Sequence, residues 1–560
     1  MTDILMENEL VEMEGNLSKQ IYIYSLSTDS FLNDNEHELH KEKQSLSLGL
    51  SLYKKELNKL EKLKNVTDEK VDQYYKNLSF TKLGDQYKPN KPSMKFLMNF
   101  FNEDLEAEII ELLQKSPKDI EKNQKDIKEI KKDIRKKKIE LFKPVKERIN
   151  KLKELLDNEA DQHKGVRVMR QEDLKDSNKV SQFDSVLTRT LGVGKNSTTT
   201  DIIMIRAFRY KVFESLVKKG FYYYKDGKRE LYKYYTSSAG AIRNKKSIFM
   251  RESVSEKVKN ALNAGLTIDK INEQGGMNVN KYNAYTALTM TASVPWEGFD
   301  IDKCIVVDDF ETDVWSKVEH IDSETYEITP DEKYISIPHT DGAGICLLDV
   351  SEKAIQIRLP YFKGLIVPFN FKKFIDMNKE ASPIVYDIWN EPHNVIEKGI
   401  TTIFTKSQFK MWKFFDDWDA YKRAFKQYNC QAAIASEEEN EDSFTDKTLS
   451  YQVLQTLTDF KEGELSGISS KTVNQIKSVG NDKDIMLEIL GVTSENDKKS
   501  SFQQALEIYP NLLNDVHSKE TIKETKKSLI TRAKSGKLIL NGTKRTFISP
   551  DTYAFAQWLF

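Results

Sequence analysis

Cysteine is scarce in this sequence, with only Cys304, Cys346 and Cys430 among 560 residues. None of the three belongs to a Cys-x-x-Cys pair, which argues against a disulfide framework and against a cysteine-rich zinc site. Buried, reduced thiols in a cytoplasmic protein are the expectation that remains.

Long apolar runs are also missing, since none approaches the roughly 20 residues that a membrane-spanning helix needs. The N-terminal segment MTDILMENELVEMEG is acidic and has no basic region followed by an apolar core, so it does not resemble a secretory signal. We therefore expect a cytoplasmic location and no membrane partner.

No excess of one charge marks the whole chain, because 86 Lys and Arg residues face 87 Asp and Glu residues. Only the distribution of charge along the chain can point to a polyanionic partner. A length of 560 residues exceeds what a single hydrophobic core accommodates, so several domains are expected.

A long helical arm is predicted between about residues 50 and 165, where Lys, Glu, Leu and Ile follow helical spacing. The seven-residue repeat of its apolar positions indicates a helical hairpin or a coiled coil, and Pro144 is expected to break or kink the helix. The positions on this stripe are Ile120, Ile127, Ile130, Ile134, Leu141, Val145, Ile149, Leu152 and Leu156.

The same arm has a local excess of positive charge, with roughly 16 basic against about 7 acidic residues between Lys115 and Lys153. Such an excess can follow the phosphates of a nucleic acid. An ordinary solvated helix face is the other interpretation.

Strand-like runs follow the arm. The segment FYYYKDGKRELYKYY, residues 221 to 235, predicts a hairpin around Asp226 and Gly227. Its tyrosines alternate with basic residues, which suits either stacking on bases or a half-buried hairpin. From 300 to 370 the runs KCIVV, YISI, GICLL, AIQIRL and GLIVPF predict a β-rich domain with short turns.

Two motifs have competing interpretations. The segment GVGKNST, residues 192 to 198, is not a phosphate-binding loop, because Arg189 stands where the first glycine is required and Asn196 follows the lysine. The carboxylates of VVDDFETD are either Mg²⁺ ligands at a strand end or residues that cap and solubilise a turn. They are Asp308, Asp309, Glu311 and Asp313.

The most informative constellation begins with HTDGAG, residues 339 to 344, in which Asp341 is either a catalytic carboxylate or part of a turn. Arg358 and Lys363 follow on either side of Pro360. Lys406 and Lys410 come next, and their spacing predicts an i, i+4 pair on one helical face. Fixed cations of this kind suit a triphosphate or a nucleic-acid backbone.

In this order the residues resemble the RNA-dependent RNA polymerases of eukaryotic RNA silencing and their phage and bacterial two-barrel relatives. The resemblance covers roughly residues 230 to 560 and leaves out the helical arm. Its elements are Thr340-Asp341-Gly342 with Gly344, Gln356-Ile357-Arg358 with Lys363-Gly364, Lys406-Ser407-Gln408-Phe409-Lys410, and Leu449-Ser450-Tyr451-Gln452.

Two segments further upstream are similar to family elements. The stretch SSAGAIRNKKSIFM, residues 237 to 250, resembles a Ser-rich Arg element and adds Arg243, Lys245 and Lys246 as weaker candidates for nucleic-acid contact. The stretch KYNAYTALTMTAS, residues 281 to 293, departs from its counterpart because Tyr285 stands where the family usually has arginine.

The resemblance implies template-directed nucleotidyl transfer with two Mg²⁺ ions held by an Asp-x-Asp-Gly-Asp loop. This chain contains no Asp-Gly-Asp, so we expect the loop to lie beyond Phe560 and name no catalytic or metal-binding residue. Asp341 and Gly342 are then expected to shape a turn. The chain is expected to be either the N-terminal part of a split or interrupted polymerase, or a degenerate relative kept for binding.

The implied fold is α+β, with a helical or coiled-coil arm, a double-psi β-barrel, a helical linker and the start of a second barrel. The expected segments are 1–30 (tail), 31–165 (arm), 166–335 (mixed α/β connecting domain), 336–460 (first barrel with inserted helices), 461–530 (helical linker) and 531–560 (incomplete second barrel).

The leading hypothesis is therefore an RNA polymerase encoded by a phage, plasmid or other mobile element. These 560 residues would lack its metal-binding loop and would be catalytically incomplete. Its partners would be RNA or DNA, nucleoside triphosphates and, on the split interpretation, a second chain with the catalytic barrel. Arg358, Lys363, Lys406 and Lys410 would bind the triphosphate or the nucleic-acid backbone. The alternatives are a non-catalytic nucleic-acid-binding protein and a coiled-coil scaffold.

Overall fold

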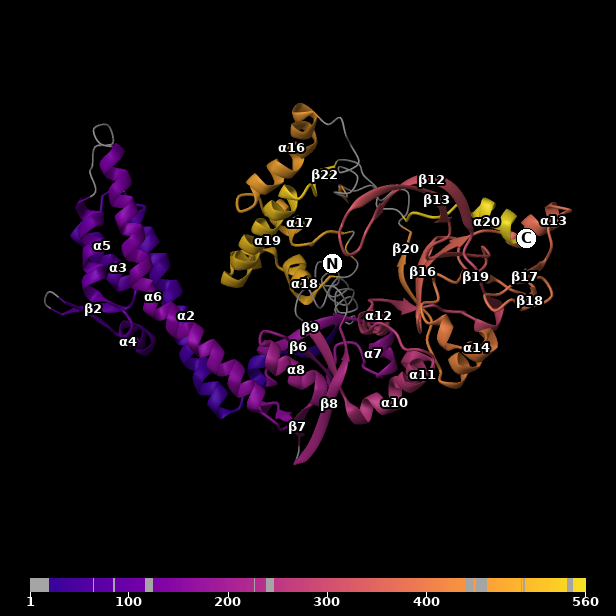
Figure 1. Ribbon diagram of the computed structural model, residues 1–560, viewed down its shortest axis with the longest axis horizontal. Helices are drawn as coiled ribbons and strands as arrows, with labels where there is room; N and C mark the ends of the chain where they lie inside the picture. The colour runs from indigo at the N-terminus through magenta and orange to yellow at the C-terminus, as the bar shows by residue number, and fades with distance from the viewer. Residues whose placement is uncertain are drawn as a thin grey trace, which may run out of the picture. The chain divides into compact units, whose positions relative to one another are not determined.

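The fold is taken from a computed structural model, and the chain divides into two compact units (Figure 1). Unit 1 consists of Met1–Ser25, Leu174–Ile205 and Tyr234–Phe560, and unit 2 of Leu26–Asp173 and Arg206–Lys233, so β1, β6 and β8 have residues in both. The structure describes residues 20–63, 65–83, 86–115, 124–225, 227–237, 246–438, 447–449, 461–494, 496, 499–540 and 547–560.

Unit 2 consists mainly of helices, drawn in indigo and purple in Figure 1. Its helices are α2 (Asp34–Glu61), α3 (Asp68–Asn77), α4 (Pro92–Met98), α5 (Glu103–Lys115), α6 (Gln124–Gln162) and α8 (Tyr210–Lys219), with the short helices η1 (Thr28–Phe31) and η2 (Gln171–Asp173). Its strands are β2 (Phe80–Leu83), β3 (Gln86–Pro89), β4 (Arg167–Val168), β7 (Phe221–Lys225) and most of β8 (Lys228–Thr236).

Helices α2 and α6 pack side by side in opposite directions (Figure 1). Glu61, the last residue of α2, pairs with Lys138 at 2.7 Å, whereas Glu42 near its start pairs with Arg148 at 2.7 Å. Of the apolar stripe predicted from the sequence, Ile134, Leu141, Val145 and Leu152 are buried in a core that these helices share with α3 to α5, and Ile130 and Ile149 pack against it. The stripe that indicated a coiled coil is thus covered within the chain.

Helix α6 runs through Pro144, so of the break or kink predicted at this residue the break is wrong, and the kink stays a prediction. A proline removes one backbone hydrogen bond and costs roughly 3 kcal/mol inside a helix. Its neighbours Leu141 and Val145 are 1% and 0% exposed in the core of unit 2. Burial of this apolar face on both sides of Pro144 offsets the local cost of the proline.

The start of α2 is fixed by a buried ion pair. Asn33 and Glu36 form a capping box, in which each side chain accepts from the other residue's backbone N–H at 2.8 Å. Arg167 of β4 then donates to both carboxylate oxygens of Glu36, at 2.7 and 2.9 Å. Both side chains are 1% exposed, so this part of unit 2 depends on their mutual neutralisation.

The predicted hairpin is confirmed as β7 and β8, which pair antiparallel from Phe221 opposite Tyr232 to Lys225 opposite Lys228. Asp226 lies outside the described residues, and Gly227 has the positive φ of 74° that such a turn requires. Phe221 and Tyr232 stack at 5.0 Å and are fully buried, whereas Tyr224 is 48% exposed. Most of this aromatic surface therefore packs inside the protein.

Unit 1 contains a mixed sheet in the strand order β10-β20-β15-β16-β14-β19-β11. Strands β14 and β16 run parallel, as do β11 and β19, and the other neighbours are antiparallel. The bounds are β10 (Val294–Pro295), β11 (Cys304–Val307), β14 (Ala343–Cys346), β15 (Ile355–Leu359), β16 (Phe362–Pro368), β19 (Thr402–Thr405) and β20 (Ala433–Glu437).

The predicted strands between 300 and 370 are present in this sheet and in the hairpin described below, which confirms the expectation of a mixed α and β fold. The sheet also includes β10 and β11, which lie before residue 336, where the first barrel was expected to begin. Cys304 and Cys346 are buried in it, and burial raises the pKa of the Cys346 thiol to about 12. A double-psi connection remains a prediction.

A second group of strands in unit 1 has the order β9-β6-β1-β5. These are β1 (Gln20–Ser27), β5 (Lys179–Phe183), β6 (Thr198–Arg206) and β9 (Lys246–Arg251). The helices beside them in sequence are η3 (Asp176–Asn178), α7 (Val186–Thr190), α10 (Glu252–Asn263), α11 (Ile268–Glu273), α12 (Val279–Thr286), η4 (Ala287–Met290) and η5 (Ile301–Lys303). The run IYIYSL, residues 21 to 26, lies within β1.

A long antiparallel hairpin, β12 (Glu311–Ile321) and β13 (Ile328–Pro338), stands between β11 and β14 in sequence. Nearly all of its side chains are exposed, among them Trp315 and Tyr334, whose rings meet edge to face at 5.0 Å. The acidic run VVDDFETD enters this hairpin, which places Glu311 and Asp313 on an exposed strand.

The C-terminal part of unit 1 is helical, as predicted from 461 onward. The elements here and between the strands of the mixed sheet are α13 (Phe371–Met377), β17 (Ile384–Tyr386), β18 (Pro392–Asn394), η6 (Trp412–Phe414), α14 (Trp418–Gln427), β21 (Lys447–Thr448), α16 (Glu462–Ser478), α17 (Lys483–Ile489), α18 (Ser501–Ile508), η7 (Pro510–Asn514), α19 (Val516–Lys534), β22 (Ile539–Leu540) and α20 (Thr552–Leu559). None of the helices in the described ranges combines the length and apolarity of a membrane span.

The prediction of strands at the end of the chain is wrong for most of the described residues there. Only Ile539–Leu540 form a strand, paired with Lys447–Thr448, and residues 552–559 form helix α20. Asp551 caps this helix by accepting from the N–H groups of Tyr553 and Ala554 at 3.0 Å. Phe555 is fully buried in the core beside β11, β14 and β19, so α20 packs against the mixed sheet.

Candidate anion-binding site

Three segments that the sequence analysis singled out meet at one edge of the mixed sheet. They are the turn before β14, the start of β16 and the turn after β19. The N–H of Gly342 donates to Ser407 Oγ at 2.6 Å, and the N–H of Leu365 donates to the Gly342 carbonyl at 2.9 Å. The N–H of Lys363 donates to the Gln408 carbonyl at 3.1 Å. The motifs therefore form one continuous structure.

Two glycines allow this close approach of backbones. A Cβ atom on Gly344 would lie 2.4 Å from the Ile403 carbonyl oxygen, and one on Gly364 would lie 2.3 Å from the Gly342 carbonyl oxygen. The side chain of Gln408 fills the space between them and is fully buried. It accepts from the N–H of Thr405 at 3.0 Å and donates to the Leu365 carbonyl at 2.8 Å. Glycine is required at both positions on steric grounds.

Asp341 and Gly342 form the turn itself, in agreement with the prediction, and Gly342 has a φ of 72°. The side chain of Asp341 is exposed, whereas that of Thr340 is 1% exposed and accepts from the N–H of Phe310 at 2.9 Å. Asp341 therefore shapes the turn, and Thr340 joins the turn to β11.

The acidic run after β11 supports the neighbouring turns. Asp309 accepts from the N–H and the hydroxyl of Ser407 at 2.8 and 2.6 Å. Burial raises the pKa of Asp309, and the hydrogen bonds from Ser407 and Thr340 act in the opposite direction. Asp308 pairs with Lys406 at 2.6 Å. Within the described ranges, no three His, Cys, Asp or Glu side chains converge in a way that could hold a metal ion.

Arg358, Lys363 and Lys410 form a cluster of positive charge at this edge, which we call the cationic trio. Arg358 on β15 lies directly opposite Lys363 on β16. Burial lowers the pKa of Lys363, and the charges of Arg358 and Lys410 lower it further. The guanidinium of Arg358 is largely buried, and this burial lowers its pKa too.

The trio has no acidic partner in the part of the chain that the structure describes. Among the described residues, no ion pair involves these three side chains, and their polar contacts go to neutral oxygens. Arg358 donates to the Ile357 carbonyl at 2.6 Å and to Thr291 Oγ1 at 3.4 Å, and Lys410 donates to the Ser407 carbonyl. Converging cations without a carboxylate favour a bound polyanion.

Lys406 and Lys410 do not form the predicted helical pair. Residues 406 to 408 are a turn, and Phe409 bridges to Phe362. Lys406 instead faces Asp308 and lies 4.9 Å from the centre of the Trp412 ring, whereas Lys410 belongs to the cationic trio. The prediction was wrong because the i, i+4 spacing was interpreted without the aromatic core around Phe409, which fixes the turn.

Other candidate residues lie elsewhere or outside the described residues. Arg243 and Lys245 fall in 238–245, and Gln452 in 450–460, all outside the described ranges. Lys246 begins β9 and is exposed. The predicted contact of Lys246 with nucleic acid stays a prediction.

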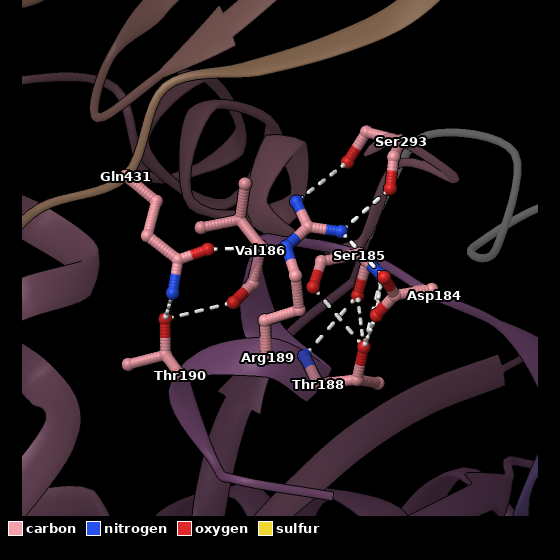
Figure 2. A network of polar contacts seen from close by, with 8 residues as sticks. All are labelled: Asp184, Ser185, Val186, Thr188, Arg189, Thr190, Ser293 and Gln431. Carbon is pink, nitrogen blue, oxygen red and sulfur yellow. Dashed lines mark hydrogen bonds and ion pairs between the residues drawn. The ribbon is translucent and has the colours of Figure 1, made fainter. Parts of the chain in front are cut away.

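A polar network behind Arg358 was missed by the sequence analysis. Figure 2 shows the guanidinium of Arg189 between Asp184, Ser293 and Gln431. It donates to Asp184 Oδ2 at 2.8 Å, to the Ser293 carbonyl at 2.6 Å and to Gln431 Oε1 at 3.1 Å.

The Arg189 network fixes a segment that touches the cationic trio. The segment 291–293 includes Thr291, which accepts from Arg358, and Ser293, which accepts from Arg189. Gln431 comes just before β20, the neighbour of β15. The sequence analysis noted Arg189 only because it stands where a phosphate-binding loop would need glycine. That observation gave no sign that Arg189 fixes a segment far away in the sequence.

Comparison with known proteins adds one relative. No protein-family model matches the chain. Over 414 residues the chain is 48% identical to the protein named DNA-directed RNA polymerase YonO of Bacillus phage SPbeta. This alignment covers 74% of the chain and 48% of that protein, so the chain spans about half the length of this relative. The similarity relates the chain to an RNA polymerase.

Proposed function

We propose that this chain takes part in template-directed RNA synthesis as a nucleotidyltransferase of the two-barrel class, of which the mixed sheet would be the first double-psi barrel. The observation that carries the proposal is the cationic trio without a carboxylate partner among the described residues. Its position at the junction of the three motifs fits the order of elements in that class. The similarity to a phage RNA polymerase supports the same conclusion.

In this proposal the trio binds phosphate. Arg358 presents a planar guanidinium that suits two phosphate oxygens at once, and Lys363 and Lys410 supply point charges beside it. Lys363 is exposed, so an anion can reach it beside the buried Arg358 that lies opposite it. Lys406 is already engaged by Asp308, so we assign it a smaller role in anion binding.

The family's reaction uses Mg²⁺ to activate the attacking hydroxyl and to neutralise pyrophosphate. The carboxylates of the described residues do not fit this requirement, because no three of them converge on one point. No step of the proposed reaction therefore runs through a metal bound by these residues. The sequence also lacks Asp-Gly-Asp, so a polypeptide of these 560 residues is expected to bind substrates without incorporating nucleotides.

The template is proposed to be DNA, in line with the name of the phage relative. An RNA template, as in the silencing polymerases that the motifs resemble, is the alternative. Both templates pair with the RNA product in a duplex with A-like features, so the cationic trio alone suits either one. The proposal includes a location in the cytoplasm, where nucleic acid and nucleoside triphosphates are both available.

Binding of a fluorescent RNA–DNA hybrid and of an RNA duplex to the full chain tests the proposal. Replacement of Lys363 and Lys410 by alanine should weaken binding of at least one of them about tenfold or more, because two charge-assisted contacts are lost. The control is Lys373→Ala with Lys379→Ala, which removes two exposed lysines on and just after α13.

The outcome is decided by comparing the two double variants. Weaker binding by the trio variant alone would support the proposal, and the preferred ligand would identify the template class. Equal affinity of both variants and the unchanged protein would refute the role of the trio. A normal circular dichroism spectrum of the trio variant excludes unfolding as the cause.

A further inference from the structure

Helix α6 has a continuous row of exposed positions that contains only basic and neutral residues. The row follows the helical spacing of three or four residues, so its members lie on one face. We call this row the α6 ridge, and its members are Lys128, Lys132, Arg135, Ile139, Lys143, Lys146, Asn150 and Lys153. All eight are exposed.

Three cations of α6 that lie outside the ridge are neutralised by ion pairs with neighbouring helices. Lys137 pairs with Glu108, Lys138 with Glu61, and Arg148 with Glu42. Within the described part of α6, the one ion pair of a ridge residue joins Lys143 to Glu147 at 3.9 Å. Both of those side chains are more than 60% exposed, so this pair is weak.

The neighbouring helix extends the positive charge. Lys54 of α2 lies over the ring of Phe142, with its Nζ 5.3 Å from the ring centre. Burial lowers the pKa of Lys54, and the nearby charge of Lys146 lowers it further. The acidic residues of α6 in this region, such as Glu129, Asp133 and Glu140, occupy other positions around the helix. The ridge itself contains no acidic residue between Lys128 and Lys153, whereas Glu147 lies one turn from Lys143 and Asp157 one turn beyond Lys153.

The dimensions and chemistry of the ridge favour a nucleic-acid duplex over a single strand. From Lys128 to Lys153 the helix rises about 38 Å, which is close to the ~34–36 Å of one turn of B-DNA. The ridge contains no aromatic side chain, whereas sites for single strands stack bases on aromatic rings. In a duplex the bases are stacked inside and the phosphates face outward, so a duplex-binding surface needs no aromatic rings.

We propose that the α6 ridge binds the phosphate backbone of a nucleic-acid duplex over about one helical turn, a contact separate from the cationic trio. The choice of nucleic acid as the partner class rests on the proposed function. The ridge would hold duplex independently of its sequence, because contacts to phosphates carry no base information. An acidic protein is the competing partner, and an unchanged affinity of the ridge variant for the duplex in the test below would favour it.

The test uses the full chain and a fluorescein-labelled 20-base-pair DNA duplex of arbitrary sequence. The ridge variant is Lys132→Gln, Arg135→Gln and Lys146→Gln. The control variant is Lys62→Gln, Lys76→Gln and Lys95→Gln, which removes the same net charge from exposed lysines elsewhere in unit 2. Binding is measured by fluorescence anisotropy over a series of salt concentrations.

The ridge variant should bind the duplex about tenfold or more weakly at moderate salt, and its slope of log affinity against log salt should fall by about 2 to 3. The control variant should keep both the affinity and the slope. Equal effects in the two variants, or no effect in either, would overturn the proposal. A larger loss for 20-nucleotide single strands than for the duplex would contradict the assignment of a duplex.

The outcome for the ridge variant can be separated from the outcome for the cationic trio. The Lys363→Ala, Lys410→Ala variant keeps the ridge, so its residual duplex binding measures the ridge alone. If the trio variant loses nothing while the ridge variant loses affinity, the trio proposal fails and the ridge proposal stands. If the ridge variant loses nothing while the trio variant does, the reverse holds.

Discussion

At the residue scale, the cationic trio shows how charge without a partner marks a site. Arg358 is only 8% exposed, and its polar contacts among the described residues are with neutral oxygens. A buried guanidinium without a counter-ion costs free energy that a structural role alone does not repay. A bound phosphate would repay it, which is why the trio carries the functional proposal.

Glu106 gives a residue-scale prediction about pH. Burial raises its pKa to about 8, and its carboxyl accepts from the hydroxyl of Tyr74 at 3.0 Å inside unit 2. Because the folded-state pKa lies above the unfolded value near 4.5, the stabilisation is complete below pH 4.5 and is lost as pH rises through 8.

The predicted loss is up to about 5 kcal/mol between these limits, since one pKa unit corresponds to ~1.36 kcal/mol. Hydrogen exchange of amides in α3 and α5, measured at pH 6 and pH 8.5, reports the local free energy of opening. Glu106→Gln should remove most of the difference between the two pH values, after correction for the intrinsic exchange rate. The same pH dependence in wild type and variant would show that Glu106 is not its source.

The buried pair of Arg167 and Glu36 gives a second prediction. Arg167→Ala should lower the free energy of unfolding of unit 2 by about 3–5 kcal/mol, because Glu36 would remain buried without a partner. Chemical denaturation followed by circular dichroism measures this loss, since unit 2 is mainly helical. The double variant Arg167→Met, Glu36→Leu should recover much of the stability, and a double variant as unstable as the single one would contradict this account.

At the scale of elements, the close contact of three backbones depends on glycine. Gly344→Ala would place a Cβ 2.4 Å from a backbone carbonyl on β19 and 2.7 Å from Gln408 Oε1. We expect a loss of about 3 kcal/mol in the free energy of unfolding, at the upper end for overpacking. The control is Gly467→Ala in α16, where nothing lies within 4 Å of the added Cβ.

The control should be neutral or stabilise the protein by about 0.5–1 kcal/mol, because alanine favours a helix over glycine. Thermal unfolding of the two variants beside the unchanged protein makes the comparison. A Gly344→Ala variant with unaltered melting temperature would show that β14, β16 and β19 are not packed as closely as described.

Strands were predictable from the sequence where the local pattern determines them. The runs that became β7, β8, β11, β15 and β16 are rich in β-branched and aromatic residues between turn signals. Elements that depend on distant packing were not predictable. Pro144 stays helical because Leu141 and Val145 are buried against other helices, and α20 forms because Phe555 enters a core built about 200 residues earlier in the sequence.

In the candidate site, too, the sequence predicted what local motifs determine and missed what depends on distant contacts. The order of the motifs placed Arg358, Lys363 and Lys410 among the candidate residues, and the fold brings these three together. The sequence could not separate Lys406 from Lys410, because Asp308 and the Phe409 core decide which way each one faces. Arg189 was missed for a similar reason, since its partner Ser293 lies more than 100 residues away.

At the scale of the whole molecule, the chain combines a helical unit and a unit that contains the mixed sheet, and each presents uncompensated positive charge. The overall net charge of −1 conceals both features. Nucleic-acid binding, as proposed above, would give both surfaces a shared explanation.

The most direct test of the central claim is a crosslinking measurement. The full chain is incubated with an RNA–DNA hybrid that carries 4-thiouridine in the RNA strand, irradiated, digested and mapped by mass spectrometry. The account predicts crosslinked peptides that contain Arg358, Lys363 or Lys410, and their loss in the Lys363→Ala, Lys410→Ala variant. Crosslinks confined to other segments, or unchanged in that variant, would contradict the claim that the cationic trio binds the nucleic acid.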